Sequence, residues 1–342
     1  MTLAEEDIDG EDDPAVSDAG IDIQYLLFLQ EFRTSIDDAW TPFMEFASSF
    51  AVDYLILFAL FIYWVIDKRK GLYVIGSMCL TLAVNQLIKL TACVYRPWIR
   101  DSRIVPAGNA IETATGYSFP SGHTATAAPQ LGGHAANEGK EHPWISVLCI
   151  LCLMVITFSR NYLGVHTPQD VLVATLESIV CLIVMWKIFG YLSLHPEKED
   201  WFLLAGVIFG IVSIAYITYK PYPMTYVNGK LLVDPQKMMN DGYGDIAFLI
   251  AFCTGRFIEK KWIRFRPMGF SLIGMILTIS GMVLYVFLHK NIRTPLDQLL
   301  GSHWGHFTWR MITVLFYMAG YPLIIRFFTG NSDSGQASET DN

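Results

Sequence analysis

Long apolar runs dominate the pattern of hydrophobic and polar positions along the chain. Three of them contain no charged residue, at 71–88, 201–219 and 267–288. A helix needs about 17–25 mainly apolar residues to cross a bilayer, so each of these runs predicts a membrane span. Runs that are shorter or contain an occasional charge predict six more spans, at 49–66, 121–138, 144–159, 169–187, 240–258 and 309–328. The pattern therefore predicts an all-α, polytopic membrane bundle of nine spans.

The pattern changes towards both ends of the chain. Between residues 22 and 48 apolar residues mix with charged ones, which is typical of helices that lie at the membrane interface. The terminal segments 1–22 and 329–342 are rich in acidic, Ser and Gly residues. Segments of this composition cannot bury enough apolar surface to fold, so both ends are predicted to be disordered tails.

Composition and charge narrow the class of protein. The chain is 53% apolar and 16% charged, whereas soluble domains are about 25% charged, so a soluble globular enzyme is excluded. The net charge of −8 comes from the ends, because residues 1–22 carry nine acids and residues 330–342 carry three, and residues 23–329 have a net charge of +4. Most cations of that body flank or interrupt apolar runs and form no separate basic stripe, so no nucleic-acid partner is expected.

The distribution of Lys and Arg predicts an orientation in the membrane. The two densest basic clusters lie at 68–70 and 256–266, and nine spans place both on the same side. Because cytoplasmic loops carry an excess of Lys and Arg, that side is predicted to be the inside. The acidic N-terminal tail and the connections 97–120 and 160–168 would then lie outside, and the C-terminal tail inside.

Lys89, Arg96 and Pro97 form the first segment that indicates chemistry. Seven residues at about 100° each bring Lys89 and Arg96 to nearly the same helix face. Pro97 disfavours helix at the preceding residue, so we expect the helix to end at Arg96. Snorkelling of a cation at a span end explains Arg96 equally well. Lys89 lies about two turns inside an apolar run, where a charge costs about 2.5–3.5 kcal/mol and usually marks a functional position.

The second segment, Pro120-Ser121-Gly122-His123, precedes a predicted span. A helix start with Gly lets backbone N–H groups approach a bound anion, and the helix dipole favours negative charge there. His123 would face that anion from the first turn. Ser at a helix cap and Gly in a turn are also common in any helix start, so this segment alone is weak evidence.

The third segment runs from Ser159 to Asp170 and contains Arg160 and His166. Asp170 follows His166 by four residues, so its carboxylate can hold one imidazole nitrogen and leave the other as a nucleophile or base. Alternatively, Thr167 is a helix cap and Asp170 completes a capping box. The chain repeats this Thr-Pro-x-Asp pattern at 294–297, where Arg293 replaces the His, so the pattern by itself carries no catalysis.

The three segments together supply three cations, a Gly-containing helix start, two histidines and one aspartate, all at predicted span ends on one side. A phosphoryl group in transfer carries charge on three oxygens and needs its attacker and leaving group in line. Cations and backbone amides suit the oxygens, and two histidines suit the two ends. The combination predicts a phosphate site.

The spacing Lys-x6-Arg-Pro, then Pro-Ser-Gly-His, then Ser-Arg-x5-His-x3-Asp resembles the type-2 phosphatidic acid phosphatase superfamily over residues 50–190. The resemblance implies a helical membrane core of about six spans within 23–190, followed by further transmembrane helices in 191–328. Because the resemblance says least about the C-terminal third, the roughly three additional spans at 240–328 have no predicted role. Membrane members of the family usually hold the site away from the cytoplasm, in agreement with the charge-based orientation.

The resemblance also implies a role for each motif residue. His166 would be the nucleophile that forms a phosphohistidine, Asp170 would hold it, and His123 would protonate the leaving oxygen. The family uses no metal or other cofactor, and the sequence has no carboxylate cluster suited to Mg²⁺. The phosphate would be held by Lys89, Arg96, Arg160, Ser121 and the amide of Gly122.

Several alternatives stay open at this level. The favoured function is hydrolysis of a lipid or polyprenyl phosphate that enters from the bilayer; the alternatives are a transporter or scaffold that keeps the anion site for binding, and a phosphotransferase acting on another lipid or sugar. No motif chooses between a glycerolipid, sphingoid, polyprenyl or sugar phosphate, or defines an oligomeric state. His303 and His306 have a spacing that suits a metal, although structural histidines are favoured, and Glu177 suits either a proton path or a hydrogen bond to another helix.

Overall fold

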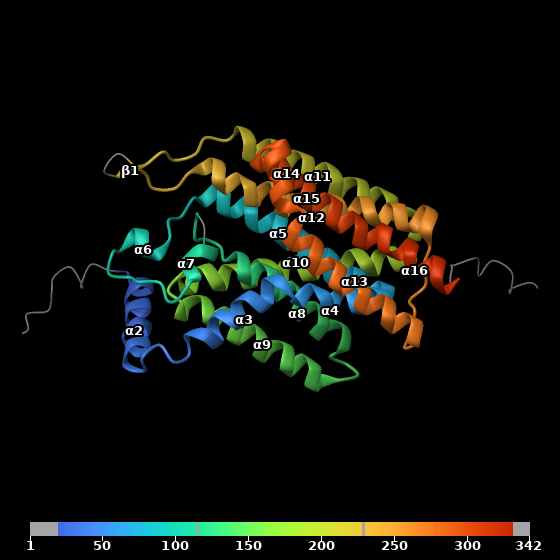
Figure 1. The fold of residues 1–342 in the computed structure, drawn as a ribbon, viewed down its shortest axis with the longest axis horizontal. Coiled ribbons are helices and arrows are strands. Elements are labelled where there is room, and N and C mark those ends of the chain that lie inside the picture. The colour runs from blue at the N-terminus through green and yellow to red at the C-terminus, as the bar shows by residue number, and fades with distance from the viewer. Residues whose placement is uncertain (1–19, 115, 228–229, 331–342) are drawn as a thin grey trace, which may run out of the picture.

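The computed structural model describes residues 20–114, 116–227 and 230–330. Most of its long helices run along one direction and form an elongated bundle (Figure 1). The N-terminal half contains α2 (Ile21–Ser35), α3 (Thr41–Asp53), α4 (Leu55–Phe61), the π-helix η1 (Ile62–Ile66), α5 (Lys68–Ala92), α6 (Pro97–Arg100), α7 (Ala110–Thr113), α8 (Gly122–Glu138), α9 (Pro143–Tyr162) and α10 (Pro168–Leu194).

The C-terminal half is also helical apart from one short hairpin, in which β1 and β2 pair in antiparallel fashion. Its elements are the 3-10 helix η2 (Pro196–Lys198), α11 (Glu199–Tyr219), β1 (Tyr226–Val227), β2 (Lys230–Leu231), α12 (Pro235–Ile258), η3 (Glu259–Ile263), α13 (Leu272–Asn291), α14 (Arg293–Leu300), α15 (Ser302–Leu315), η4 (Phe316–Gly320) and α16 (Tyr321–Thr329). The predicted tails fall mostly on residues 1–19 and 331–342, outside the described residues.

Seven helical stretches of the described residues are long and apolar enough to cross a membrane: Thr41–Ile66, Lys68–Arg100, Pro143–Tyr162, Pro168–Leu194, Pro196–Tyr219, Leu272–Leu300 and Ser302–Thr329. They correspond to seven of the nine predicted spans and confirm the all-α, polytopic class. The other two predicted spans are α8 and α12, which both pack along α5. That these two helices also cross the membrane stays a prediction.

The N-terminal boundary of the first span differs from the prediction. Helical structure begins at Thr41 and continues through α4 and η1 to Ile66, so the second half of the predicted interfacial segment 22–48 is continuous with the first candidate span. Only α2 is a separate helix, and it packs against α9. Asp22, assigned to the acidic tail from sequence, lies in the first turn of α2 and forms an ion pair with Arg100 at 2.7 Å.

The end of α5 also differs from the prediction. Asp67 caps the start of the helix by accepting hydrogen bonds from the N–H groups of Arg69 and Lys70. The helix ends at Ala92, because Cys93 adopts a left-handed conformation with φ of 51°. Lys89 therefore lies in the last turn and not two turns inside, and Arg96 lies beyond the helix. The expectation that both cations share one helix face is wrong, although the fold still brings them to one cavity.

The two predicted basic clusters lie together at one end of the bundle. Lys68 forms an ion pair with Glu259 at 2.7 Å, and Arg256 contacts the other carboxylate oxygen of Glu259. This end is opposite to α6, α7 and the hairpin, which lie on the left in Figure 1. The predicted placement of both clusters on one side, away from the 97–120 connection, is therefore present in the fold.

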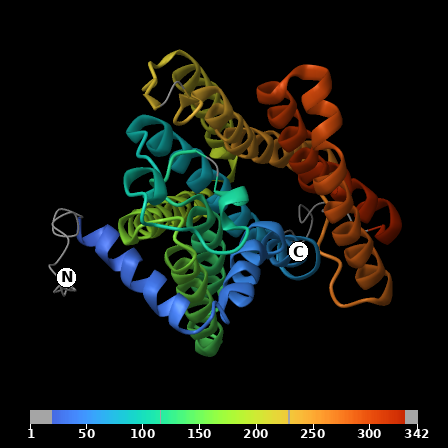
Figure 2. The same ribbon diagram turned by 60° about the vertical axis from the view of Figure 1, so that its left-hand side comes forward.

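The C-terminal helices contact α5 through α12 and contact the first span through aromatic residues of η4 and α16. Helix α12 packs against α5, α11 and α15, and Figure 2 shows it (gold) leading to the group α13–α16 (orange to red), which stands apart from α8–α10 (green). A buried aromatic cluster joins η1 to η4: the Trp64 indole N–H donates to the carbonyl of Tyr317 at 3.4 Å, and its ring lies 4.7 Å from that of Tyr321. The C-terminal third is thus part of the same hydrophobic core as the first span.

Candidate active site

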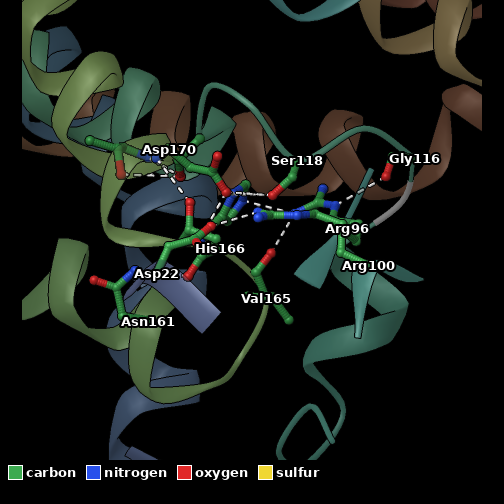
Figure 3. A network of polar contacts seen from close by, with 12 residues as sticks. Asp22, Arg96, Arg100, Gly116, Ser118, Asn161, Val165, His166 and Asp170 are labelled. Atoms are coloured by element: carbon green, nitrogen blue, oxygen red, sulfur yellow. Dashed lines mark hydrogen bonds and ion pairs between the residues drawn. The ribbon is translucent and has the colours of Figure 1, made fainter. Parts of the chain in front are cut away.

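His166 and Asp170 lie at the centre of the site. His166 belongs to the turn between α9 and α10, and Asp170 to the first turn of α10. The Nδ1 of His166 is 3.2 Å from Oδ2 of Asp170, and both side chains are buried. The same oxygen accepts hydrogen bonds from the Thr167 N–H at 2.9 Å and from the hydroxyl of Ser118 (Figure 3). Both arrangements suggested by the sequence are present, since Asp170 completes the capping box of α10 and contacts His166.

The partners of His166 define which nitrogen carries its proton. Its Nε2 lies 2.9 Å from Nη1 of Arg96. A guanidinium group only donates, so Nε2 accepts this hydrogen bond and is unprotonated. Nδ1 then carries the proton and donates a hydrogen bond to Asp170. Burial lowers the pKa of His166 well below its usual range, and the charges of Arg96, Arg160 and Lys89 lower it further. The imidazole is therefore neutral with its Nε2 lone pair directed at the cations.

Backbone carbonyls hold Arg96 in this position. Its Nε donates to the carbonyl of Gly116 at 3.1 Å, and its Nη1 donates to that of Val165 at 3.0 Å (Figure 3). The loop that carries Val165 begins at Gly164, whose φ of +72° favours glycine. The Asn161 amide donates to the carbonyl of His166 at 2.8 Å. The turn after α9 is thus rigidly placed beside the end of α5.

Arg160 brings a second guanidinium into the same region from the end of α9. Its side chain is 1% exposed, and its Nη1 donates to the hydroxyl of Ser48 on α3. Its Nε and Nη2 have no hydrogen-bond partner among the described residues. Buried charged donors without partners are costly, and an anionic group would satisfy them.

The start of α8 faces Lys89. Ser121 caps the helix, and a Cβ added to Gly122 would lie 3.6 Å from Nζ of Lys89. The absence of a side chain at Gly122 thus leaves the ammonium group beside the first turn, where His123 follows. Ser121 itself is fully buried. Its hydroxyl accepts a hydrogen bond from the Thr124 N–H, and its own N–H donates to the carbonyl of Asp170. The structure therefore assigns Ser121 to holding α8 in position more directly than to contacting a ligand.

A cavity of about 220 Å³ opens at this point. Five of the eight predicted site residues line it, namely Lys89, Arg96, Gly122, His123 and His166. Arg160, Ser121 and Asp170 are not among its lining residues. The cavity also reaches four residues that the sequence analysis missed, Gln86, Asp241, Asp245 and Arg310, and His306, which it considered only as a metal ligand. Asp241, Asp245 and Arg310 are charged residues inside predicted spans. A charge inside a span usually marks a functional position, so the reasoning used for Lys89 would also have identified these three residues.

The remaining sequence-based alternatives have clear outcomes. Glu177 accepts a hydrogen bond from the Asn85 amide of α5, which fits the interior hydrogen-bonded alternative. In the described residues the group of possible metal ligands is Glu138, Glu141 and His142, on the surface between α8 and α9. His303 and His306 are not part of it.

The repeated Thr-Pro-x-Asp pattern also has a clear outcome. Helix α14 begins two residues earlier than the pattern predicts, at Arg293 and not at Pro295, and has no side-chain cap. Arg293 instead pairs with Asp297 at 3.3 Å. The pattern at 294–297 thus forms no capping box, unlike its counterpart at 167–170.

Comparison with known proteins gives one match. Residues 70–193 match the model of the PAP2 superfamily. This region contains all eight predicted site residues, from Lys89 to Asp170. Neither the search of curated proteins nor the search of solved structures finds a match.

Proposed function

Because this chain belongs to the PAP2 superfamily, the type-2 phosphatidic acid phosphatases, through residues 70–193, we propose that it hydrolyses a lipid-type phosphate monoester or pyrophosphate through a phosphohistidine at Nε2 of His166. Phosphatase-type chemistry is what the family membership supports. The lipid substrate, the covalent intermediate and the roles of individual residues are our proposal.

In the first step the Nε2 lone pair of His166 attacks phosphorus, and the bond from phosphorus to the leaving oxygen breaks. His123 donates a proton to that oxygen, so the alcohol or phosphate leaves as a neutral or less charged group. In the second step water attacks the phosphohistidine while His123 takes its proton, and inorganic phosphate leaves with Nε2 restored. The positive charge that develops on the His166 ring is balanced by the carboxylate of Asp170.

The observation that carries this proposal is the state of His166. It is buried, its Nδ1 lies 3.2 Å from the carboxylate of Asp170, and its Nε2 lies 2.9 Å from the guanidinium of Arg96, which can only donate. Anion binding alone requires cations but no oriented, unprotonated imidazole. This argues against a transporter or scaffold that retains the site only for binding.

The cations supply the electrostatic stabilisation that the reaction requires. Lys89 and Arg96 line the cavity, and Arg160 has two buried donors without a hydrogen-bond partner among the described residues. Fixed charges in a site shielded from water stabilise the charge on the three equatorial oxygens of the transferring group. We therefore propose that no metal ion is needed.

The lining of the cavity supports an amphiphilic substrate. On α5 the cavity-lining residues are Ile75, Met78, Cys79, Leu82, Gln86 and Lys89, which recur every three or four positions and so form one face of the helix. This face changes from cationic at Lys89 to apolar at Ile75 over about 21 Å of helix. A phosphate at one end and a hydrocarbon chain along the rest would match it.

Trapping of the covalent intermediate tests the proposal. Protein turned over with ³²P-labelled lipid phosphate and quenched in alkali should carry acid-labile label, and His166→Asn should carry none. His142→Asn, which changes an exposed histidine remote from the cavity, is the matched control and should keep the label. Turnover without any label on His166 would refute the covalent mechanism. Transfer of the label to an added lipid or sugar in place of water would favour the phosphotransferase alternative.

A further inference from the structure

A second group of polar side chains lines the cavity about one helical turn from Lys89. Gln86 precedes Lys89 by three residues on α5, about 4.5 Å along the helix axis. Facing it are Asp241 and Asp245 from α12 and His306 and Arg310 from α15. Beyond this group the wall is apolar, with Leu82 and Met78 of α5 and Val314 and Met318 of the C-terminal helices.

Members of this group carry buried atoms that are not hydrogen-bonded within the described residues. Gln86 is 5% exposed; its amide nitrogen donates to Asp245 at 2.7 Å, but its carbonyl oxygen has no partner. His306 is 3% exposed, and its Nδ1 has no partner. The Nε of Arg310 is also without one. Such atoms cost free energy in a buried wall, so a ligand that satisfies them is strongly favoured.

The chemistry of these atoms selects the ligand. The carbonyl of Gln86 accepts, the guanidinium of Arg310 donates, and an imidazole nitrogen does either. A wall that offers both donors and acceptors suits a hydroxyl group, which also does both. The group contains two carboxylic acids, Asp241 and Asp245, and one guanidinium, Arg310, so it has no net positive charge that would select a second phosphate.

We propose that Gln86, His306 and Arg310 form a binding site for a hydroxyl group on the carbon skeleton of the substrate, next to its phosphate. The preferred substrate is then a hydroxylated lipid phosphate, with its apolar chain along Leu82 and Met78, and not a plain alkyl or polyprenyl phosphate. This inference rests on the proposed function of the same cavity. Two of its three residues come from α15, outside the region 70–193 that matches the family, so the selectivity is a property of the C-terminal third of this chain.

A matched pair of substrates tests the inference. The pair is 1-O-dodecylglycerol 3-phosphate, with a free hydroxyl on carbon 2, and its 2-deoxy analogue. The wild-type protein should hydrolyse the hydroxylated member with a kcat/KM at least about tenfold higher, because the analogue leaves buried polar atoms unsatisfied. Gln86→Met and His306→Phe should lower this ratio towards one, chiefly through KM of the hydroxylated substrate.

The matched control is Thr313→Val. Thr313 lines the same cavity, but its hydroxyl donates to the carbonyl of Trp309 within α15, so the variant should keep the wild-type ratio. Both substrates are measured on the same preparation, so the ratio is independent of the fraction of folded protein. Equal kcat/KM values in the wild type, or variants that slow both substrates equally, would overturn the inference while leaving the proposed function intact. Absence of hydrolysis of both substrates together with absence of label on His166 would overturn the proposed function and this inference with it.

Discussion

Replacing Asp170 by Asn should slow turnover much more than it destabilises the protein. Asn keeps one carbonyl oxygen that can accept the hydrogen bond from the Thr167 N–H, so most of the cap of α10 survives. What the variant loses is the negative charge at 3.2 Å from Nδ1 of His166. That charge is what stabilises the phosphorylated ring in the proposed mechanism.

The expected size of the effect follows from these contacts. A hydrogen bond to a charged group contributes about 1.5–3 kcal/mol, and each 1.36 kcal/mol in the barrier is a factor of ten in rate. The variant should therefore lose about 10-fold to 150-fold in kcat. Loss of a helix cap costs about 0.5–2 kcal/mol in the free energy of unfolding, and Asn should lie at or below the lower end of that range.

The control is Thr167→Ala, which removes the hydroxyl that accepts the Asp170 N–H at 3.4 Å and leaves the carboxylate in place. It should lower stability as much as Asp170→Asn or more, with little change in kcat. The assay is release of inorganic phosphate at saturating substrate, with thermal unfolding followed on the same detergent-solubilised samples. If kcat and stability fall in parallel in both variants, Asp170 acts only through the folding of α10 and the reasoning is refuted.

Four further predictions follow from the same site. In ¹⁵N-histidine NMR spectra His166 should stay the neutral, Nδ1-protonated tautomer at pH 6.5, where an ordinary histidine is about half protonated, because burial and the neighbouring cations lower its pKa; a midpoint at or above pH 6.5 would contradict this. His123→Ala should slow hydrolysis of an alkyl phosphate by about 10²–10⁴-fold but slow that of a nitrophenyl phosphate far less, and equal losses on both would exclude its role as acid. Hydrolysis should survive excess EDTA and be inhibited by orthovanadate, whereas activity that is lost in EDTA and restored by Mg²⁺ or Zn²⁺ would disprove the metal-free mechanism. In a cysteine-free background, a Cys at Ser102 should react with an impermeant maleimide in intact cells or sealed vesicles and a Cys at Arg69 should not, and the reverse result would place the site on the cytoplasmic face.

Local features of the chain were predictable wherever their physical cause is local. Apolar runs of sufficient length predict spans because desolvation depends on the residues of the run itself. Thr167 and Asp170 predict a helix start because a capping box joins residues only three apart. The same reasoning failed at 294–297, where Arg293 pairs with Asp297 and the helix starts earlier.

The predicted end of α5 at Arg96 was wrong because Pro97 limits how far the helix can extend but does not set the residue at which it ends. A proline disfavours helical conformation at the preceding residue, Arg96, but does not require the helix to extend as far as that residue. Cys93 leaves the helix four residues before Pro97, and Arg96 turns to the carbonyls of Gly116 and Val165. These partners lie 20 and 69 residues away in the sequence, so no local pattern contains them.

The order of residues is sufficient to predict the class of protein and the chemical groups of the candidate phosphate site, because apolar runs and spaced motifs are local features of the chain. The packing of the helices places Arg96 against Nε2 of His166 and Ser118 against the carboxylate of Asp170, and no sequence pattern predicts either contact. This packing alone brought Gln86 of α5 against Asp245 of α12, 159 residues away, and added His306 and Arg310 to the same cavity. Such contacts depend on how separate helices pack. The sequence does not distinguish a buried polar residue that pairs with a neighbouring helix from one that contacts a ligand.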